Sequence, residues 1–198
     1  MADWCAAILA GGRGRRLGGA VKPLLDVGGR SILARQAGVL ATLGAVPRLI
    51  APDAAPFAGL GFDVVPDAVD AGALGALYTA LIHATAPHVL VLAGDLPFIT
   101  APFLRALLDA RAAADVVLPA PGGRWHPLCA VYKASTAPHL RRAIDAGRWR
   151  ITDALGGLAV LCLHDDALAA CDPSGRLLRN VNTPDDAEAA QREAGEPG

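Results

Sequence analysis

Residues 4–25 read WCAAILAGGRGRRLGGAVKPLL, and this stretch decides the fold class. Residues 5–9 are apolar throughout, which is typical of a β-strand that is buried on both faces. Five glycines and three arginines follow within residues 10–25. Because ligands of parallel α/β sheets bind at the carboxyl ends of the strands, we expect this loop to bind a ligand.

Beyond this stretch, short apolar runs alternate with longer helical patterns. The alternation predicts a single α/β domain over residues 1–198, in three layers, with a mostly parallel sheet and helices on both faces. The loop after the apolar run at 88–92 is then a second expected ligand site. Ser31, Thr100 and Thr183 precede helical patterns and are predicted to cap them. The predicted strands are residues 5–9, 48–51, 63–65, 88–92, 116–119, 128–132 and 159–164, and the predicted helices follow Ser31, span 73–84, run from Thr100 to about 113, span 136–146 and follow Thr183.

Composition excludes several classes of protein. The chain has 198 residues, is 53% hydrophobic and carries a net charge of −1, so no basic surface for nucleic acid is expected. No apolar stretch reaches the roughly eighteen residues that a membrane-spanning helix needs. The four cysteines lack metal-site spacing and are expected to be buried free thiols in a reducing compartment. We therefore predict a cytoplasmic protein without a nucleic-acid or membrane partner.

The loop after the first predicted strand carries the residue types that bind phosphate. Glycines let backbone N–H groups approach an anion, and arginines add paired donors. Lys22, one of only two lysines in the chain, supplies a further positive charge. Neither common phosphate loop fits, because Leu17 stands where a dinucleotide-binding motif needs glycine, and Pro23 follows Lys22 where a P-loop needs Ser or Thr. The loop predicts a triphosphate site of another kind; the alternative is a glycine-rich turn with solvated arginines.

Six segments of the chain, in order, resemble those of nucleotidyltransferases with a GT-A-like, Rossmann-like α/β fold. Within them the chain is most similar to the MobA family, the molybdenum cofactor guanylyltransferases. The closing segment favours this family, because related cytidylyltransferases more often have Asp-x-Asp-Thr-Pro there. The matching segments are Leu9 to Gly12 with Arg16, Gly18, Gly19 and Lys22, then Asp67, then residues 72–77, 94–98, 126–132 and 180–186.

The chain also departs from the family's pattern. Val21 stands where the family usually has Asp, and Gly94 where it has Cys. Residues 22–25 read Lys-Pro-Leu-Leu, which is closer to sugar-phosphate nucleotidyltransferases and cobinamide-phosphate guanylyltransferases. These departures concern the acceptor more than the reaction.

The resemblance implies Mg²⁺-dependent transfer of GMP from GTP to molybdopterin, which yields the guanine dinucleotide form of the cofactor and pyrophosphate. Mn²⁺ is an alternative ion, and other proteins of the molybdenum cofactor pathway are partners implied by the resemblance alone. The nucleotide is expected to bind the half formed by about residues 1–100, and the acceptor the half formed by about 101–192. Two alternatives stay open. One is a sibling reaction, namely cytidylyl transfer to molybdopterin or nucleotidyl transfer to a sugar phosphate or cobinamide phosphate. The other is a non-catalytic nucleotide-binding protein.

The chemistry of such a transfer is mainly electrostatic. The acceptor phosphate is already an anion, so no serine or cysteine nucleophile is required, and positioning and charge stabilisation carry the reaction. Asp95 follows a buried strand and is well placed to bind Mg²⁺, although Asp-x-Pro is also common in turns. The predicted catalytic residues are Arg16, Lys22 and Asp95, and the predicted metal ligands are Asp95 and Asn182. The predicted nucleotide-binding residues are Leu9, Ala10, Gly11, Gly12, Arg13, Gly14, Lys22, Asp67 and Asp95. The predicted acceptor-binding residues are His126, Pro127, Asn180 and Asn182, with Trp125 and Trp149 as further candidates.

Overall fold

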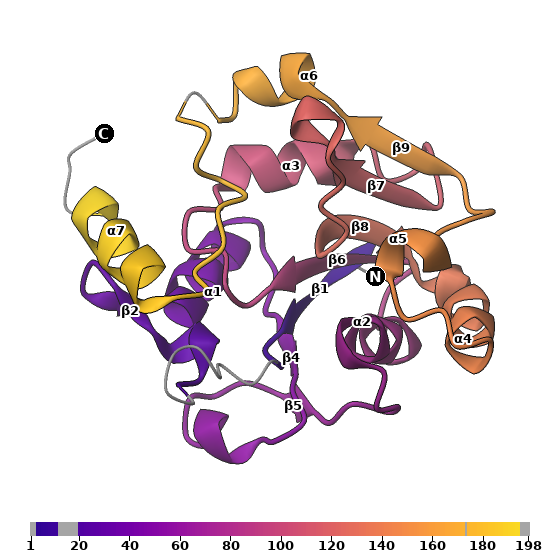
Figure 1. Cartoon of the computed structure of the whole chain (residues 1–198), viewed down its shortest axis with the longest axis horizontal. Helices are drawn as coiled ribbons and strands as arrows, with labels where there is room; N and C mark the ends of the chain where they lie inside the picture. The colour runs from indigo at the N-terminus through magenta and orange to yellow at the C-terminus, as the bar shows by residue number, and fades with distance from the viewer. Residues whose placement is uncertain (1–2, 12–19, 173, 195–198) are drawn as a thin grey trace.

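The computed structural model of the protein describes residues 3–11, 20–172 and 174–194, and it is built around one seven-stranded sheet (Figure 1). The strand order is β5-β4-β1-β6-β8-β7-β9. Four neighbouring pairs are parallel, and only β8 runs antiparallel to its neighbours β6 and β7. The predicted mostly parallel sheet is therefore confirmed. The strands are β1 Trp4–Leu9, β4 Arg48–Ile50, β5 Val64–Val65, β6 His88–Ala93, β7 Val116–Pro119, β8 Cys129–Lys133 and β9 Val160–Leu163.

Helices cover both faces of the sheet because successive strand residues point to opposite sides. On β1, Ile8 joins an apolar cluster with Leu33 and Leu40, whereas its neighbour Leu9 joins the opposite cluster with Leu74. Each fully buried Leu or Ile contributes roughly 1.5–3 kcal/mol, so these two clusters supply most of the stabilising burial. One face is covered by α1 Ile32–Thr42, α3 Ala101–Asp109 and α6 Asp165–Ala169, and the other by α2 Gly72–Ile82, α4 Ala137–Asp145 and α5 Ile151–Ala154.

Two of the three predicted helix caps form. The Ser31 hydroxyl accepts a hydrogen bond from the Ala34 amide at 3.1 Å at the start of α1. Thr183 Oγ1 accepts from the Asp186 amide at 3.2 Å, and Asp186 Oδ2 accepts from the Thr183 amide at 2.9 Å, which closes a reciprocal cap. Thr100 occupies the predicted N-cap position of α3, but its hydroxyl is buried and makes no capping hydrogen bond among the described residues.

The helix that follows Thr100 is also shorter than predicted. α3 ends at Asp109 rather than near residue 113. Beyond it, the amides of Arg111 and Ala113 bond three residues back, to Leu108 and Ala110, so the chain tightens into turns. The prediction extended the helix across alanines, which have a high helix propensity but no apolar face to bury there.

The C-terminal helix returns to the region just after the first loop. A small hairpin, β2 Asp26–Val27 paired with β3 Arg30–Ser31, precedes α1, and α7 Pro184–Ala194 packs against it (Figure 1). Val27, Ile32, Val181 and Ala190 form the buried core of this contact. The packing holds residues 180–183 beside Lys22, which is distant in sequence.

Two expectations from composition can be compared with the fold. No helix in the described ranges is long and apolar enough to cross a membrane. The four cysteines are free, as predicted, but only Cys129 is fully buried. Burial raises the pKa of the Cys129 thiol to about 12, so it remains a neutral thiol at physiological pH.

Candidate functional site

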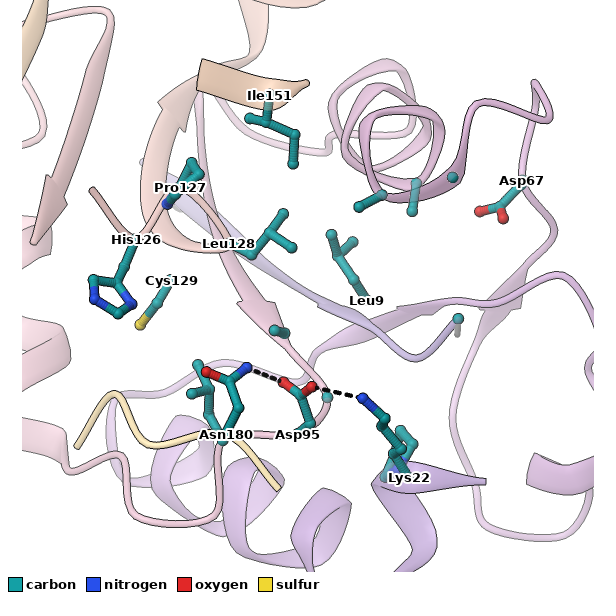
Figure 2. A pocket seen from close by; sticks show the side chains of 18 of the residues that line it. Leu9, Lys22, Asp67, Asp95, His126, Pro127, Leu128, Cys129, Ile151 and Asn180 are labelled. Carbon is teal, nitrogen blue, oxygen red and sulfur yellow. Dashed lines mark hydrogen bonds and ion pairs between the residues drawn. The ribbon is translucent and has the colours of Figure 1, made fainter. Parts of the chain in front are cut away.

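A cavity of about 700 Å³ opens at the carboxyl ends of β1, β5 and β6 (Figure 2). This is where the order of parallel strands predicts a ligand site. One wall comes from the loops after these three strands and the other from the segment that leads into β8. The first wall includes Leu9, Gly11, Lys22, Asp67, Asp70, Gly94 and Asp95, and the second wall contains Arg124, Trp125, His126, Pro127 and Leu128. Ile151 of α5 and Asn180, which precedes α7, also line the cavity.

Asp95 lies two residues beyond the end of β6, and both of its carboxylate oxygens and its backbone carbonyl have polar partners. Its Oδ1 accepts a hydrogen bond from Asn180 Nδ2 at 2.7 Å, and its Oδ2 pairs with the Lys22 ammonium at 3.2 Å (Figure 2). Its backbone carbonyl accepts from the Val181 amide at 2.9 Å. The side chain is only 15% exposed. Three segments that are far apart in sequence therefore meet at one carboxylate.

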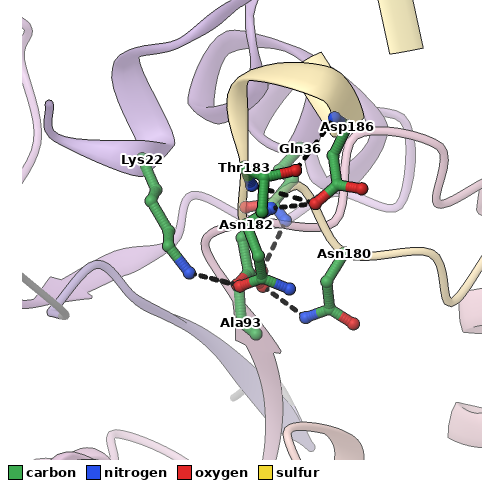
Figure 3. A network of polar contacts seen from close by, with 8 residues as sticks. Lys22, Gln36, Ala93, Asn180, Asn182, Thr183 and Asp186 are labelled. Carbon is green, nitrogen blue, oxygen red and sulfur yellow. Dashed lines mark hydrogen bonds and ion pairs between the residues drawn. The ribbon is translucent and has the colours of Figure 1, made fainter. Parts of the chain in front are cut away.

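Lys22 begins a short 3₁₀ turn, Lys22–Leu24, and its ammonium reaches a second oxygen. Nζ donates to Asn182 Oδ1 at 2.5 Å as well as to Asp95 (Figure 3). The Asn182 backbone amide donates to Asp186 Oδ2, which fixes the asparagine at the start of α7. A carboxylate oxygen and an amide oxygen thus converge on a single positive charge at the edge of the cavity.

Gly94 permits the close approach that builds this cluster. A Cβ at this position would lie 2.7 Å from Pro23 Cγ and 3.0 Å from the Leu9 carbonyl oxygen. The Gly94 amide donates to the same Leu9 carbonyl at 3.0 Å. Glycine therefore allows the turn that carries Asp95 to pack directly on the segment that carries Lys22.

Asp67 lies on the same wall but has different surroundings. It follows β5, and its Oδ1 is buried without any hydrogen-bond partner in the described part of the chain. Burial, and then the negative charge of Asp70, raise the pKa of the Asp67 carboxyl. The next amide, Ala68 N–H, donates to Thr79 Oγ1 of α2 at 2.9 Å. The hydrogen bond to Thr79 thus fixes the loop that carries Asp67, while Asp67 Oδ1 remains available to a ligand in the cavity.

The second wall is less polar. His126 is anchored through its backbone, since its amide donates to the Pro119 carbonyl and its carbonyl accepts from the Cys129 amide. Burial, and then the positive charge of Arg124, lower the pKa of His126, so its imidazole is neutral at physiological pH. The Tyr132 hydroxyl donates to the Pro127 carbonyl at 2.6 Å and fixes the start of β8.

The structure brings most of the predicted residues to this cavity. Leu9 and Gly11 line it, whereas Ala10 between them is buried and donates its amide to the Ile50 carbonyl. Asn182 contributes through Lys22 rather than by lining the cavity. Gly12, Arg13, Gly14 and Arg16 lie outside the described residues.

Several lining residues could not be identified from sequence alone. Trp125 lines the cavity as anticipated, but Trp149 is 60% exposed and does not. Arg124, Asp70 and Ile151 were not predicted. Arg124 lies two residues before His126, and its charge next to the 126–132 segment was the one sequence feature that could have identified it as a lining residue.

The donor set of this cluster suits a hard divalent ion. No group of three or more His, Cys, Asp or Glu side chains that could bind a metal occurs within residues 3–11, 20–172 and 174–194. A bound ion would therefore depend on Asp95, on the Asn182 amide oxygen and on substrate phosphates. All of these are oxygen ligands, which Mg²⁺ and Mn²⁺ prefer, and two of them already converge on a cation.

Comparison with known proteins gives concordant matches. Residues 6–159 match the family described as MobA-like NTP transferase domain. A curated protein of Rhodopseudomonas palustris (strain BisB5), named molybdenum cofactor guanylyltransferase, is 35% identical over 94% of this chain and 92% of its own. The similarity therefore extends over both walls of the cavity.

Solved structures share the fold. Molybdopterin-guanine dinucleotide biosynthesis protein A from Archaeoglobus fulgidus superposes with a TM-score of 0.79 at 26% identity, covering 95% of this chain and 97% of the other. The 2-C-methyl-D-erythritol 4-phosphate cytidylyltransferase of Thermus thermophilus gives 0.66 at 21% identity, covering 96% and 98%. The predicted nucleotidyltransferase fold is confirmed, and because a cytidylyltransferase shares it, the fold does not select the base.

Proposed function

The chain belongs to the MobA-like NTP transferase family, and from this premise we propose that it transfers GMP from GTP to molybdopterin and releases pyrophosphate. The chain is a nucleotidyltransferase; the base and the acceptor are the parts that we propose. The name of the Rhodopseudomonas relative supports guanylyl transfer, because the similarity covers almost the whole of both chains.

One observation carries the proposal. Lys22, Asp95 and Asn182 converge at the edge of a cavity of about 700 Å³, although up to 160 residues separate them in sequence. A cavity of this size accommodates a nucleotide together with part of an acceptor. The convergence of an ammonium with two oxygen ligands supports a site that brings polyanions together.

The residues of the first wall bind the nucleotide in this proposal. The Lys22 ammonium offsets the negative charge of the triphosphate and of the leaving pyrophosphate. Asp95 and Asn182 hold the divalent ion, which neutralises phosphate charge and acts as a Lewis acid when bound. Arg16 is assigned to the phosphates on sequence alone.

Asp67 binds the nucleoside part of GTP in this proposal. Its unpartnered Oδ1 can accept a hydrogen bond from a ribose hydroxyl or from the N–H groups of guanine. Leu9 and Gly11 line the same wall and supply backbone groups close to the base. A buried acceptor without a protein partner costs stability, and a nucleoside donor would satisfy it.

The second wall binds the acceptor. His126 and Pro127 line the wall opposite the first wall, which supports a division into a nucleotide half over about residues 1–100 and an acceptor half over about 101–192. Asn180 lies at the boundary, because it also donates to Asp95. The acceptor phosphate, already an anion, attacks the α-phosphorus of GTP and displaces pyrophosphate, so the protein needs to position it rather than to deprotonate it.

Three further parts of the proposal concern the cell. We place the enzyme in the cytoplasm, we take Mg²⁺ as its ion with Mn²⁺ as a substitute, and we expect contacts with other proteins of the molybdenum cofactor pathway. The alternative is a sibling reaction, either cytidylyl transfer to molybdopterin or transfer to a sugar phosphate or cobinamide phosphate. The Lys22-Pro23-Leu24-Leu25 segment favours the last two acceptors.

The test measures pyrophosphate release from each of GTP, CTP, ATP and UTP with Mg²⁺, in the presence of molybdopterin, a sugar phosphate or cobinamide phosphate. We expect release only with GTP and molybdopterin. Release with CTP and molybdopterin, or with another acceptor, would assign a sibling reaction. Binding of GTP without release under any combination would indicate a non-catalytic protein.

The chain offers a matched control for the role of Lys22. Its other lysine, Lys133, also pairs with an aspartate, Asp115, at 3.3 Å, but outside the cavity. We expect Lys22→Met to lower kcat by roughly 10²- to 10³-fold, the usual loss on removing one group that stabilises transition-state charge. Lys133→Met removes an equivalent charge and is expected to leave turnover unchanged. Equal effects of the two substitutions would contradict the assignment.

A further inference from the structure

Gln36 is a fully buried polar side chain on α1, and its position in the core is unusual. Its exposed fraction is 0%, and the other buried positions of the same helix are Ile32, Leu33 and Leu40. A buried amide without partners costs stability. Gln36 Nε2 donates two hydrogen bonds, one to the Ala93 carbonyl at 2.8 Å (Figure 3) and one to the Leu96 carbonyl at 3.1 Å.

The two acceptors flank the residue at the centre of the site. Ala93 ends β6, Leu96 follows the turn, and Asp95 lies between them. One amide group on α1 therefore ties together both ends of the turn that presents the Asp95 carboxylate. Further backbone hydrogen bonds of residues 93–96 are made with Leu9, Leu128 and Val181.

A glutamine at this position brings a cost in stability as well as a gain. Because both partners are carbonyls, the NH₂ group must face the turn, and the other end of the amide, Oε1, is buried without a partner in the part of the chain that the structure describes. A buried acceptor in this state costs about 1–3 kcal/mol, which offsets the gain from the two donated bonds. Leucine has a similar size and would leave no side-chain polar atom unpartnered, but it would also remove this donor from the Ala93 and Leu96 carbonyls.

We propose that Gln36 is a positioning residue for nucleotidyl transfer, which holds the turn from Ala93 to Leu96 so that Asp95 faces Lys22 and the metal-bound phosphates. The inference rests on the proposed function of Asp95. Gln36 does not touch substrate; it acts through the backbone of the turn. Carboxylate placement matters because small displacements of positioned groups reduce rates strongly.

The first experiment compares Gln36→Leu with Leu40→Ala, a change that destabilises the same helix without touching the turn. We expect Gln36→Leu to lower kcat and Mn²⁺ affinity roughly 10- to 100-fold, as for other groups that orient a metal ligand, with little change in the KM for GTP. Mn²⁺ affinity is measured by electron paramagnetic resonance, and amide hydrogen exchange is expected to quicken in peptides that contain residues 93–96. Leu40→Ala is expected to lower the melting temperature but to leave kcat, Mn²⁺ affinity and the hydrogen exchange of residues 93–96 near their wild-type values.

A second variant gives a signature that a purely structural role would not produce. In Gln36→Glu, a carboxylate would face two carbonyl oxygens, which raises the pKa of the new carboxyl. Its protonated form can donate one of the two hydrogen bonds, so we expect the ratio of variant to wild-type kcat to rise as the pH falls. The same ratio for Gln36→Leu is expected to be independent of pH.

The outcomes separate this inference from the proposed function. The inference would be overturned if Gln36→Leu kept wild-type kcat, Mn²⁺ affinity and hydrogen exchange. It would also be overturned if Leu40→Ala lowered kcat and Mn²⁺ affinity as much as Gln36→Leu does. If the wild-type protein released no pyrophosphate with any acceptor, the proposed function would fail, while Mn²⁺ affinity and hydrogen exchange would still decide the role of Gln36.

Discussion

The two loops that carry Asp95 and Asp67 hold their carboxylates in opposite ways. Both oxygens of Asp95 are engaged, one by Asn180 and the other by Lys22, and the turn is tied at both ends. Asp67 has a buried oxygen without a partner among the described residues, and its loop is held by a side-chain hydrogen bond in which the Ala68 amide donates to Thr79 Oγ1. Two aspartates on the same wall of one cavity thus differ. The protein supplies hydrogen-bond partners for both carboxylate oxygens of Asp95, but not for the buried oxygen of Asp67 within the described residues.

The difference fits the two different roles that we propose for these loops. A carboxylate that positions a metal and phosphates benefits from a fixed geometry before substrate arrives. A carboxylate that recognises the nucleoside must keep an acceptor free for the ligand, and the protein tolerates the cost of its burial. Substitutions in the two loops should therefore change different kinetic constants.

The largest effect is expected for Asp95→Asn. The amide replaces a charged oxygen with an NH₂ group that faces Lys22 and repels its ammonium. We expect kcat to fall roughly 10²- to 10³-fold or more, with melting temperature near the wild-type value. Asp115→Asn, which removes the carboxylate of the other Lys–Asp pair, is the control and should retain activity. Wild-type kcat in Asp95→Asn would remove this residue from the site.

A smaller effect, on binding rather than on turnover, is expected for Asp67→Asn. Asparagine keeps an oxygen that can accept a hydrogen bond but removes the negative charge. Because a hydrogen bond to a charged group contributes about 1 kcal/mol more than one between neutral groups, GTP should bind roughly 5- to 10-fold more weakly, as measured by calorimetry. The control is Asp63→Asn, which removes an exposed carboxylate that pairs with Arg48 away from the cavity. Unchanged GTP affinity in Asp67→Asn would mean that its free oxygen is not used by the nucleotide.

The pH dependence of stability in Asp67→Asn also tests whether the Asp67 carboxylate is buried without compensation. Because the pKa of Asp67 is raised in the folded state, its ionisation costs stability, and the cost develops as the pH rises from the ordinary aspartate value of 3.8 through the raised pKa. Asparagine does not titrate. The melting temperature of Asp67→Asn relative to wild type is therefore expected to rise across that window and then level off. A relative melting temperature that falls as the pH rises would contradict the shift.

The smallest effect is expected for Thr79→Val. The substitution removes the acceptor of the Ala68 amide and loosens the loop that carries Asp67. We expect a KM for GTP that is raised by about two- to fivefold, an unchanged kcat, and a loss of about 1 kcal/mol of stability. Thr136→Val removes a comparable buried hydroxyl, which donates to the Lys133 carbonyl outside the cavity, and should reproduce the loss of stability alone. A lowered kcat in Thr79→Val would show that the two loops are not independent.

The departures from the family's sequence pattern acquire a physical explanation in the structure. Gly94 and Pro23, which belong to two separate departures, are in contact, and a Cβ on Gly94 would lie 2.7 Å from Pro23 Cγ. The small residue beside Asp95 and the proline beside Lys22 therefore fit one another. Along the chain they indicated only a different acceptor; in space they form one local packing arrangement beside Lys22 and Asp95.

The sequence predicted the elements well where the signal is local. Apolar runs identified the strands, and Ser31 and Thr183 were correctly predicted as caps, because hydrophobic alternation and capping depend on residues within one turn. Thr100 failed for a tertiary reason, since its hydroxyl is buried without forming the local bond. The antiparallel course of β8 was also not predicted, because alternation of elements does not specify strand direction.

The amino-acid sequence by itself therefore determined the α/β class, the glycine-rich loop and the identities of the residues that we propose to bind phosphate and metal. Only the tertiary structure decided which polar atoms face one another: Lys22 with Asp95 and Asn182, and Gln36 with the turn around Asp95. It also decided that Asp67 keeps an oxygen free. The physical reason is that propensity and periodicity act over a few residues, whereas a hydrogen bond between groups 57 to 160 residues apart depends on strand order and packing to within a fraction of an ångström.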